Sequence, residues 1–163
     1  MTANVEVLIG SGVIPSYAHP GDAGADLCAG ESCTLAPGQR ATVGTGVSLA
    51  LPNGYVGFLV PRSGLAAKHG ITLVNSPGTV DAGYRGEIRV TLLNTDTERS
   101  FAIALGDRIA QLIVLPVSRA TFVPVRELPG SHRGRSGFGS TGVRSDVSGQ
   151  ASATPQNEEF IRE

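Results

Sequence analysis

The chain has 163 residues, a formal net charge of −1 at pH 7 and a pI of about 6.3. This length suits one domain with a real core, and the balanced charge indicates no general affinity for nucleic acid or anionic membranes. The longest apolar run, 112–117, is far shorter than a membrane span. No Lys or Arg precedes Arg40, so the N-terminus lacks the basic region of a signal or transit peptide. We therefore expect a soluble, cytoplasmic protein.

The spacing of glycine and proline favours strands over helices. Twenty-two glycines and ten prolines interrupt the chain every few residues, which long helices would not tolerate. Between them, apolar residues alternate with small or polar ones. Short alternating segments separated by turn residues predict an all-β sandwich or barrel. The expected strands cover residues 5–8, 43–51, 55–60, 88–93, 101–105, 109–117 and 121–125.

One short helix is predicted at residues 63–69. Ser63 supplies a capping residue, Lys68 and His69 lie in the last turn, and Gly70 follows. A helix of two turns depends on tertiary packing for its stability.

The C-terminal part of the chain differs in composition from the rest. Residues 144–163 are rich in Ser, Gln, Asn and charge, which predicts a disordered tail. We expect a β domain over residues 1–130, a glycine-rich arm over 131–143 and the tail over 144–163.

The cysteines and histidines predict no metal or disulfide framework. Cys28 and Cys33 are too few for a disulfide scaffold. Two reduced thiols are favoured, although the two cysteines could approach each other across a turn. The three histidines have no zinc-ligand spacing.

Five glycine-punctuated segments contain the candidate functional residues: 22–27, 61–64, 75–86, 106–112 and 133–142. Each one alone has an ordinary structural explanation; an Asp such as Asp81 in a turn usually forms an Asx-turn. Together, and in this order, they resemble the five motifs of the homotrimeric dUTPases, which hydrolyse dUTP to dUMP and diphosphate. The resemblance covers residues 5–142. It implies a distorted jelly-roll-like β-barrel or sandwich with one short helix and a flexible C-terminal arm.

The resemblance implies roles for the first two segments. Asp26 would help to hold a Mg²⁺ ion through water, which suits an ion that retains several waters beside phosphates; Asp22 would be structural. Arg62, Ser63 and Gly64 would bind the phosphates. A helix N-terminus attracts anions, and a guanidinium matches phosphate oxygens.

The hairpin segment would form the nucleoside pocket. Its backbone would read the uracil edge, exclude the thymine methyl group and reject cytosine, whose amine is a donor where uracil has an acceptor. Tyr84 would pack under the sugar and obstruct a 2′-hydroxyl. Asp81 would be catalytic by positioning the attacking water. The substrate-binding residues implied here are Asn75, Thr79, Val80, Asp81, Tyr84 and Arg89.

In the fourth segment, Gln111 interrupts an apolar strand, so its amide needs partners if it is buried. The resemblance makes Gln111 a second catalytic residue, near the α-phosphate and the attacking water. Asp107 and Arg108 are expected to form a structural or interface ion pair.

The last segment would close over the nucleotide and expel water. Arg133, Ser140 and Thr141 would contact the outer phosphates and Phe138 would stack on the uracil ring. Its sequence departs from the family pattern, which usually has an acid where Arg135 and a glycine where Ser136 stand.

The implied reaction is a Mg²⁺-dependent attack of water on the α-phosphorus of dUTP, with sites shared between the subunits of a homotrimer. It would limit uracil in DNA and supply dUMP for dTTP synthesis. Two alternatives stay open. One is a dCTP deaminase, or a bifunctional deaminase and diphosphatase, with Glu87 as the nearest candidate acid–base. The other is a dUTP-responsive protein-binding module.

Overall fold

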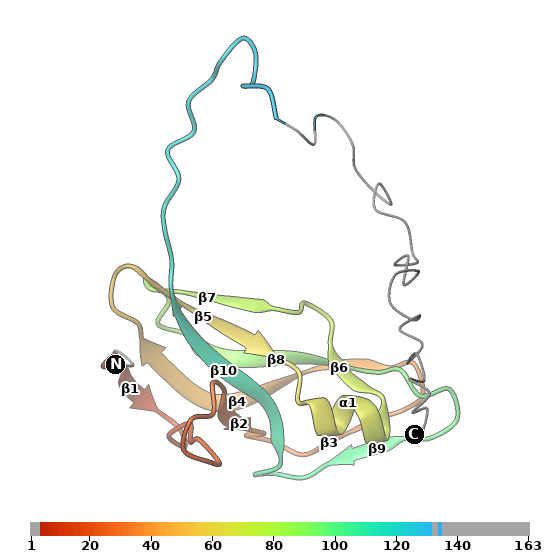
Figure 1. Ribbon diagram of the computed structural model, residues 1–163. Helices are drawn as coiled ribbons and strands as arrows, with labels where there is room; N and C mark the ends of the chain where they lie inside the picture. Colours follow the sequence, from red (N-terminus) through yellow and green to blue (C-terminus); the bar gives the residue numbers. More distant parts are fainter. Residues whose placement is uncertain (1–3, 132–133, 135–163) are drawn as a thin grey trace, which may run out of the picture. The chain divides into compact units, whose positions relative to one another are not determined.

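The computed structural model describes residues 4–131 and 134 (Figure 1). The chain divides into two compact units, Met1–Ala120 and Thr121–Glu163, which we treat separately. All described strands and the single helix lie in the first unit, which confirms the predicted all-β class. They are β1 (Leu8–Ser11), β2 (Ala25–Cys28), β3 (Cys33–Leu35), β4 (Arg40–Ala50), β5 (Tyr55–Val60), α1 (Ser63–His69), β6 (Ile71–Leu73), β7 (Gly78–Asp81), β8 (Glu87–Asn94), β9 (Phe101–Ile103) and β10 (Arg108–Pro116).

The strands form two four-stranded antiparallel sheets, ordered β1-β4-β8-β6 and β2-β10-β5-β7, and a small β3-β9 pair. The two larger sheets make a jelly-roll-like sandwich, with α1 and the β3-β9 pair at one end (Figure 1). Side chains alternate across each strand, so every second residue enters the core. Its most buried members are Leu27, Leu35, Val43, Val47, Ile71, Ile88, Val90, Leu92, Ile109 and Ala110.

Helix α1 has the predicted bounds, but its N-terminal cap is not the predicted residue. Gly70 is left-handed, with φ of 65°, and its N–H bonds back into the last turn. Arg62, not Ser63, is the N-cap, and it makes no side-chain capping bond. Ser63 is already helical, so its hydroxyl is past the capping position. The rings of His69 and Phe101 lie 5.0 Å apart and join the helix to β9.

The strand predicted at 121–125 is wrong. These residues belong to the second unit and form no strand. Phe122 and Val123 are 93% and 71% exposed. Alternation alone does not make a strand, because its backbone groups need a hydrogen-bonded neighbour. The unpredicted strands β2, β3, β6 and β7 have only three or four residues each, too few to display a clear period of two.

Buried Asn94 ties together the end of β8 and the turn that follows. Its amide donates to the carbonyls of Leu35 (3.1 Å) and Arg99 (2.8 Å), and its oxygen accepts from the N–H of Asp96 (3.0 Å). The residue is fully inaccessible. This side chain therefore supplies hydrogen bonds that the sheet cannot.

Both cysteines carry free thiols, as the sequence favours. Burial, reinforced by the charge of Glu31, raises the pKa of Cys33. Within residues 4–131 and 134, no helix has the length and apolarity to cross a membrane.

Candidate active site

A pocket of about 210 Å³ lies beside the connection between β7 and β8, within the hairpin segment 75–86. The hairpin predicted there is wrong: β7 pairs with β5 and β8 pairs with β4 and β6, so the two strands belong to different sheets. The structure brings together here all the residues predicted from the hairpin segment, with contributions from β5, β7, β8 and the loop before β7. The lining residues are Leu59, Asn75, Gly78, Thr79, Val80, Asp81, Tyr84, Glu87, Ile88 and Arg89.

Asp81 ends β7 with an exposed carboxylate. Its backbone carbonyl accepts the N–H of Tyr84 (3.0 Å), which closes the turn. Within the described residues, its side chain makes no hydrogen bond or ion pair. The carboxylate is therefore available to a substrate or a water molecule at the pocket.

The ring of Tyr84 is held by its hydroxyl and by a glycine. The hydroxyl donates to the carbonyl of Glu87 (2.9 Å). A Cβ at Gly86 would lie 2.5 Å from that hydroxyl oxygen, so this ring position requires glycine at 86. Arg85 donates to the carbonyls of Ala82 and Tyr84, at 2.7 and 2.6 Å, and fixes the turn. The turn between β7 and β8 thus presents a preset aromatic surface.

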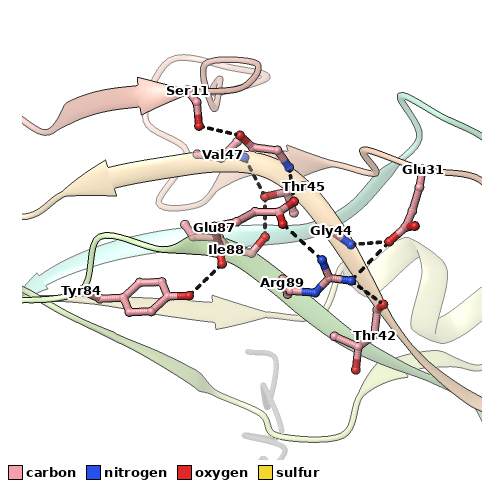
Figure 2. A network of polar contacts seen from close by, with 11 residues as sticks. Ser11, Glu31, Thr42, Gly44, Thr45, Val47, Tyr84, Glu87, Ile88 and Arg89 are labelled. Carbon is pink, nitrogen blue, oxygen red and sulfur yellow. Dashed lines mark hydrogen bonds and ion pairs between the residues drawn. The ribbon is translucent and has the colours of Figure 1, made fainter.

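At the β8 side of the pocket, a carboxylate–guanidinium network joins β8 to β4 (Figure 2). Arg89 contacts Glu87 (3.2 Å) and Glu31 (3.5 Å). The other oxygen of Glu87 accepts the N–H of Gly46 (2.8 Å), where the β4–β8 register is broken by a bulge. The hydroxyl of Thr45 bonds the carbonyl of Ile88 (2.7 Å) and replaces a missing ladder contact. Both Glu87 and Arg89 are therefore committed to protein partners.

A second group of predicted residues surrounds Asp26 on β2, whose side chain is 5% exposed. Its carboxylate accepts from Arg62 Nε (3.1 Å), Arg108 Nη1 (3.2 Å) and Gln111 Nε2 (3.3 Å). Asp107 and Arg108 form no ion pair with each other among the described residues of one copy, where Arg108 binds Asp26 instead. Asp107 instead accepts the N–H of Ala104 in the preceding turn (2.9 Å).

The hairpin pocket and the Asp26 group are separated within one copy. On β5, Val60 pairs with Gln111, while Val56 pairs with Asp81. These rows are about 13 Å apart along the strand, and β10 and β7 lie on opposite sides of β5, about 10 Å apart. The two Cα atoms are thus about 16 Å apart. Even with both side chains pointing at each other, their reach of roughly 3 and 5 Å would leave about 8 Å between the functional groups, whereas two groups that share one water lie within about 6 Å. One copy does not bring Asp81 and Gln111 to a common water.

The remaining predicted residues are exposed or outside the described part. Ser63 and Gly64 are exposed at the start of α1, and open space surrounds the position of a Cβ at Gly64. Arg133, Phe138, Ser140 and Thr141 lie outside the described residues, as does most of the predicted arm and the predicted tail.

The described residues offer a Mg²⁺ ion an indirect contact. Residues 4–131 and 134 contain no cluster of three or more His, Cys, Asp or Glu side chains suited to a metal. Asp26 Oδ1 already has two donors and Oδ2 has one. A carboxylate has about four acceptor sites, so one remains on Oδ2. This remaining site fits a metal-bound water.

The chain matches known proteins over most of its length. A dUTPase family model matches residues 11–142. The deoxyuridine 5′-triphosphate nucleotidohydrolase of Leifsonia xyli subsp. xyli is 66% identical over 150 residues, which cover 92% of this chain and 99% of the relative. The protein of that name from Thermobifida fusca is 64% identical over 129 residues, covering 79% and 72%.

Solved structures of dUTPases also match this chain. The dUTPase of Staphylococcus bacteriophage 80alpha with bound dUpNHpp has a TM-score of 0.77 and 32% identity, over 87% of this chain and all of that one. A dUTPase of phage phi11 of S. aureus, in which the coordination of a structural Mg(II) ion is described, has a TM-score of 0.71 and 25% identity, over 77% and 99%. The chain therefore belongs to the dUTPase family, and the enzyme class that its sequence predicts, a dUTP diphosphatase, is confirmed.

Proposed function

We propose that this protein hydrolyses dUTP to dUMP and diphosphate, by attack of water on the α-phosphorus. The observation that carries the proposal is the hairpin pocket, where Asp81 presents an unpartnered carboxylate among the described residues beside Tyr84. The phage relative with dUpNHpp, a dUTP analogue, supports the substrate. In the cytoplasm, this reaction would keep uracil out of DNA and supply dUMP for dTTP synthesis.

Catalysis would consist mainly of positioning and charge neutralisation. Asp81 would orient the water and accept its proton as the bond to the α-phosphorus forms and the bond to the diphosphate oxygen breaks. Gln111 would hold the same water, and Arg62, with Ser63 and Gly64, would bind phosphate oxygens. A Mg²⁺ ion, held through water by Asp26, would neutralise the triphosphate when bound.

Selectivity would arise in the hairpin segment. The backbone of Thr79 and Val80, with the Asn75 side chain, would match the uracil edge, and Tyr84 would pack under the deoxyribose. Arg89, which lines the pocket, would contact the substrate while its guanidinium also binds Glu87 and Glu31. The arm residues Arg133, Phe138, Ser140 and Thr141 would complete the site.

The test of function is diphosphate release from dUTP, dCTP, dTTP and UTP with Mg²⁺. We expect dUTP to exceed each competitor in kcat/KM by about 10³-fold or more, since unmatched buried polar groups discriminate strongly. In Tyr84→Ala, the ratio of kcat/KM for dUTP to kcat/KM for UTP should fall at least about tenfold. Loss of one buried contact commonly changes the discrimination between two substrates by that factor. The preference over dTTP should persist, and Tyr17→Ala, which removes an exposed tyrosine outside the pocket, should change neither ratio. Equal rates with UTP in the wild type would contradict the proposal.

A deaminase is disfavoured by the position of Glu87. Both of its carboxylate oxygens are engaged, one by Gly46 N–H and the other by Arg89. A general acid–base for an exocyclic amine needs a carboxyl group free to face the base. The dCTP arm of the assay, with ammonia as the second readout, tests this alternative directly.

We further propose a homotrimer in which Asp81 of one copy faces Gln111 of another. The separation of about 16 Å within one copy supports this, because both residues are needed at one water. The apolar side chains of Phe122, Val123 and Leu128 are also 71–93% exposed, as expected of a surface that meets another chain.

Subunit mixing tests the shared site. Asp81→Asn and Gln111→Leu should each be nearly inactive, whereas trimers formed from an equimolar mixture should regain about a quarter of wild-type activity, since a random pair of neighbours supplies both intact residues one time in four. Native mass spectrometry verifies that trimers containing subunits of both variants have formed. The control is each variant alone, taken through the same subunit-exchange procedure. If mixed trimers form without any recovery, both residues belong to the same copy's site.

A further inference from the structure

Asp26 is the centre of a donor cluster that holds two predicted active-site groups. Its carboxylate binds Arg62 Nε at 3.1 Å and Gln111 Nε2 at 3.3 Å through one oxygen, and Arg108 Nη1 at 3.2 Å through the other. These partners come from the β5–α1 junction and from two positions on β10. Because Asp26 is nearly inaccessible, its contacts are shielded from water and strongly directional.

This contact determines which end of the Gln111 amide faces outward. An ionised carboxylate accepts hydrogen bonds and cannot donate, so the NH₂ group must face Asp26. The carbonyl oxygen of Gln111 therefore points away from Asp26, and among residues 4–131 and 134 it accepts no hydrogen bond. A carbonyl oxygen is an acceptor, which is what an attacking water needs as it loses a proton.

Gly24 confines the Gln111 side chain from the other side. A Cβ at Gly24 would lie 3.0 Å from Gln111 Cβ, 3.1 Å from Cδ and 3.2 Å from Oε1. The backbone of Gly24 has an ordinary φ, so this glycine is required by the close approach and not by its conformation. Gln111 is thus fixed between a carboxylate and a bare backbone.

The Arg62 guanidinium is also held in one orientation, by two hydrogen bonds. Its Nε donates to Asp26, and its Nη1 donates to the carbonyl of Arg108 (3.2 Å). With these donors engaged, the remaining donors of the guanidinium are left for an anion, and its side chain is 24% exposed. The two arginines and one aspartate leave the cluster with a net positive charge, which suits phosphate.

We infer that Asp26 is a positioning residue of the proposed hydrolysis: it sets the Gln111 amide with its oxygen toward the attacking water and aligns the Arg62 guanidinium for the phosphates. This role rests on the proposed function but is separate from holding a metal-bound water. Asp26 acts here through its neighbours, in every copy, before any ligand binds.

A double-mutant cycle tests the inference. Asp26→Asn, which is isosteric and can bond either end of an amide, should lower kcat by about 10²-fold, because small misplacements of catalytic groups have effects of that size. In the Gln111→Leu background the placement of the amide is already lost and only the alignment of Arg62 remains to be disturbed, so the same substitution should lower kcat by less than about tenfold. Additive effects would overturn the inference. Asp22→Asn is the matched control, because among residues 4–131 and 134 the Asp22 side chain bonds only to His19, in its own turn.

The variant Gly24→Ala tests the position of the Gln111 amide without changing the Asp26 side chain. Its methyl group would push the Gln111 side chain by a few tenths of an ångström, so kcat should fall about tenfold, while the affinity for dUpNHpp changes less than about threefold. Unchanged kcat in this variant would contradict the inference. Thermal unfolding shows whether Asp26→Asn and Gly24→Ala are folded. If one of them does not fold, the kcat of the other tests the inference.

Two further measurements separate positioning from metal binding. If Asp26 positions its neighbours, the kcat of Asp26→Asn stays low at saturating Mg²⁺; recovery by added Mg²⁺ would assign the effect to the metal instead. In the metal-free, substrate-free protein, the side-chain ¹⁵N–H₂ resonances of Gln111 should shift in Asp26→Asn and not in Asp22→Asn. An unmoved Gln111 signal would overturn the inference even if the wild type hydrolyses dUTP. A wild type that does not hydrolyse dUTP would instead refute the proposed function.

Discussion

Replacement of Asp81 by asparagine is expected to lower kcat for dUTP by about 10²–10⁴-fold, the usual contribution of a positioned general base. Asparagine keeps the size of the side chain but accepts a proton poorly. Because the Asp81 side chain has no hydrogen bond or ion pair among the described residues, the substitution breaks no contact there. The affinity for dUpNHpp should stay within a few-fold of the wild type. The measurement is single-turnover diphosphate release together with calorimetric binding of the analogue.

The control for this prediction is Glu98→Gln, which neutralises an exposed carboxylate in the β8–β9 turn. It should leave kcat unchanged. If Asp81→Asn turns over at a near-normal rate, Asp81 does not act on the water. If kcat and analogue binding fall together, Asp81 contributes to binding the ground state instead.

Replacement of Asn94 by alanine is expected to lower the free energy of unfolding by about 3 kcal/mol, the largest loss of stability that we predict. The change removes three hydrogen bonds and leaves two carbonyls and one N–H without that partner at a buried site. Each kcal/mol lowers Tm by about 2–4 °C for a chain of this size, so we expect a decrease of about 6–12 °C. Urea unfolding at a fixed protomer concentration measures the free energy, and a thermal scan measures Tm.

Asn53→Ala is the matched control, because Asn53 lies exposed in the β4–β5 turn. Its effect should be within about 0.5 kcal/mol, as for most surface substitutions. A loss of less than about 1 kcal/mol in Asn94→Ala would mean that water or rearranged backbone satisfies the freed groups.

Local signals in the sequence predicted the fold best where the chain marks both ends of an element. Helix α1 and strand β5 have the predicted bounds. A glycine ends the first, and a Pro-Asn-Gly turn precedes the second. The predicted strand at 121–125 has the same alternation, yet the structure gives it no neighbouring strand. Alternation describes which faces a segment could bury, whereas a strand depends on a partner elsewhere in the chain.

In the candidate site, too, the sequence predicted the groups that are close along the chain and missed the contacts between distant residues. The hairpin residues were found because they are close in sequence, and the structure gathers them around one pocket. Arg108 was assigned to Asp107 because the two are adjacent, but its partner Asp26 is 82 residues away. Successive strand residues point to opposite faces, so neighbours in sequence are poor candidates for an ion pair. Glu31, 58 residues from Arg89, carries no sequence signal for that contact.

The contact between Asn94 and Leu35 has a kinetic consequence. The two residues are 59 positions apart, so the hydrogen bond forms only after β3 and β8, from distant parts of the chain, have met. Interactions that span such a loop are usually absent from the folding transition state's local nucleus, because closing the loop costs entropy first. Weakening this contact would then speed unfolding and leave the refolding rate almost unchanged. The lifetime of the native sandwich, more than its rate of formation, depends on this one buried amide.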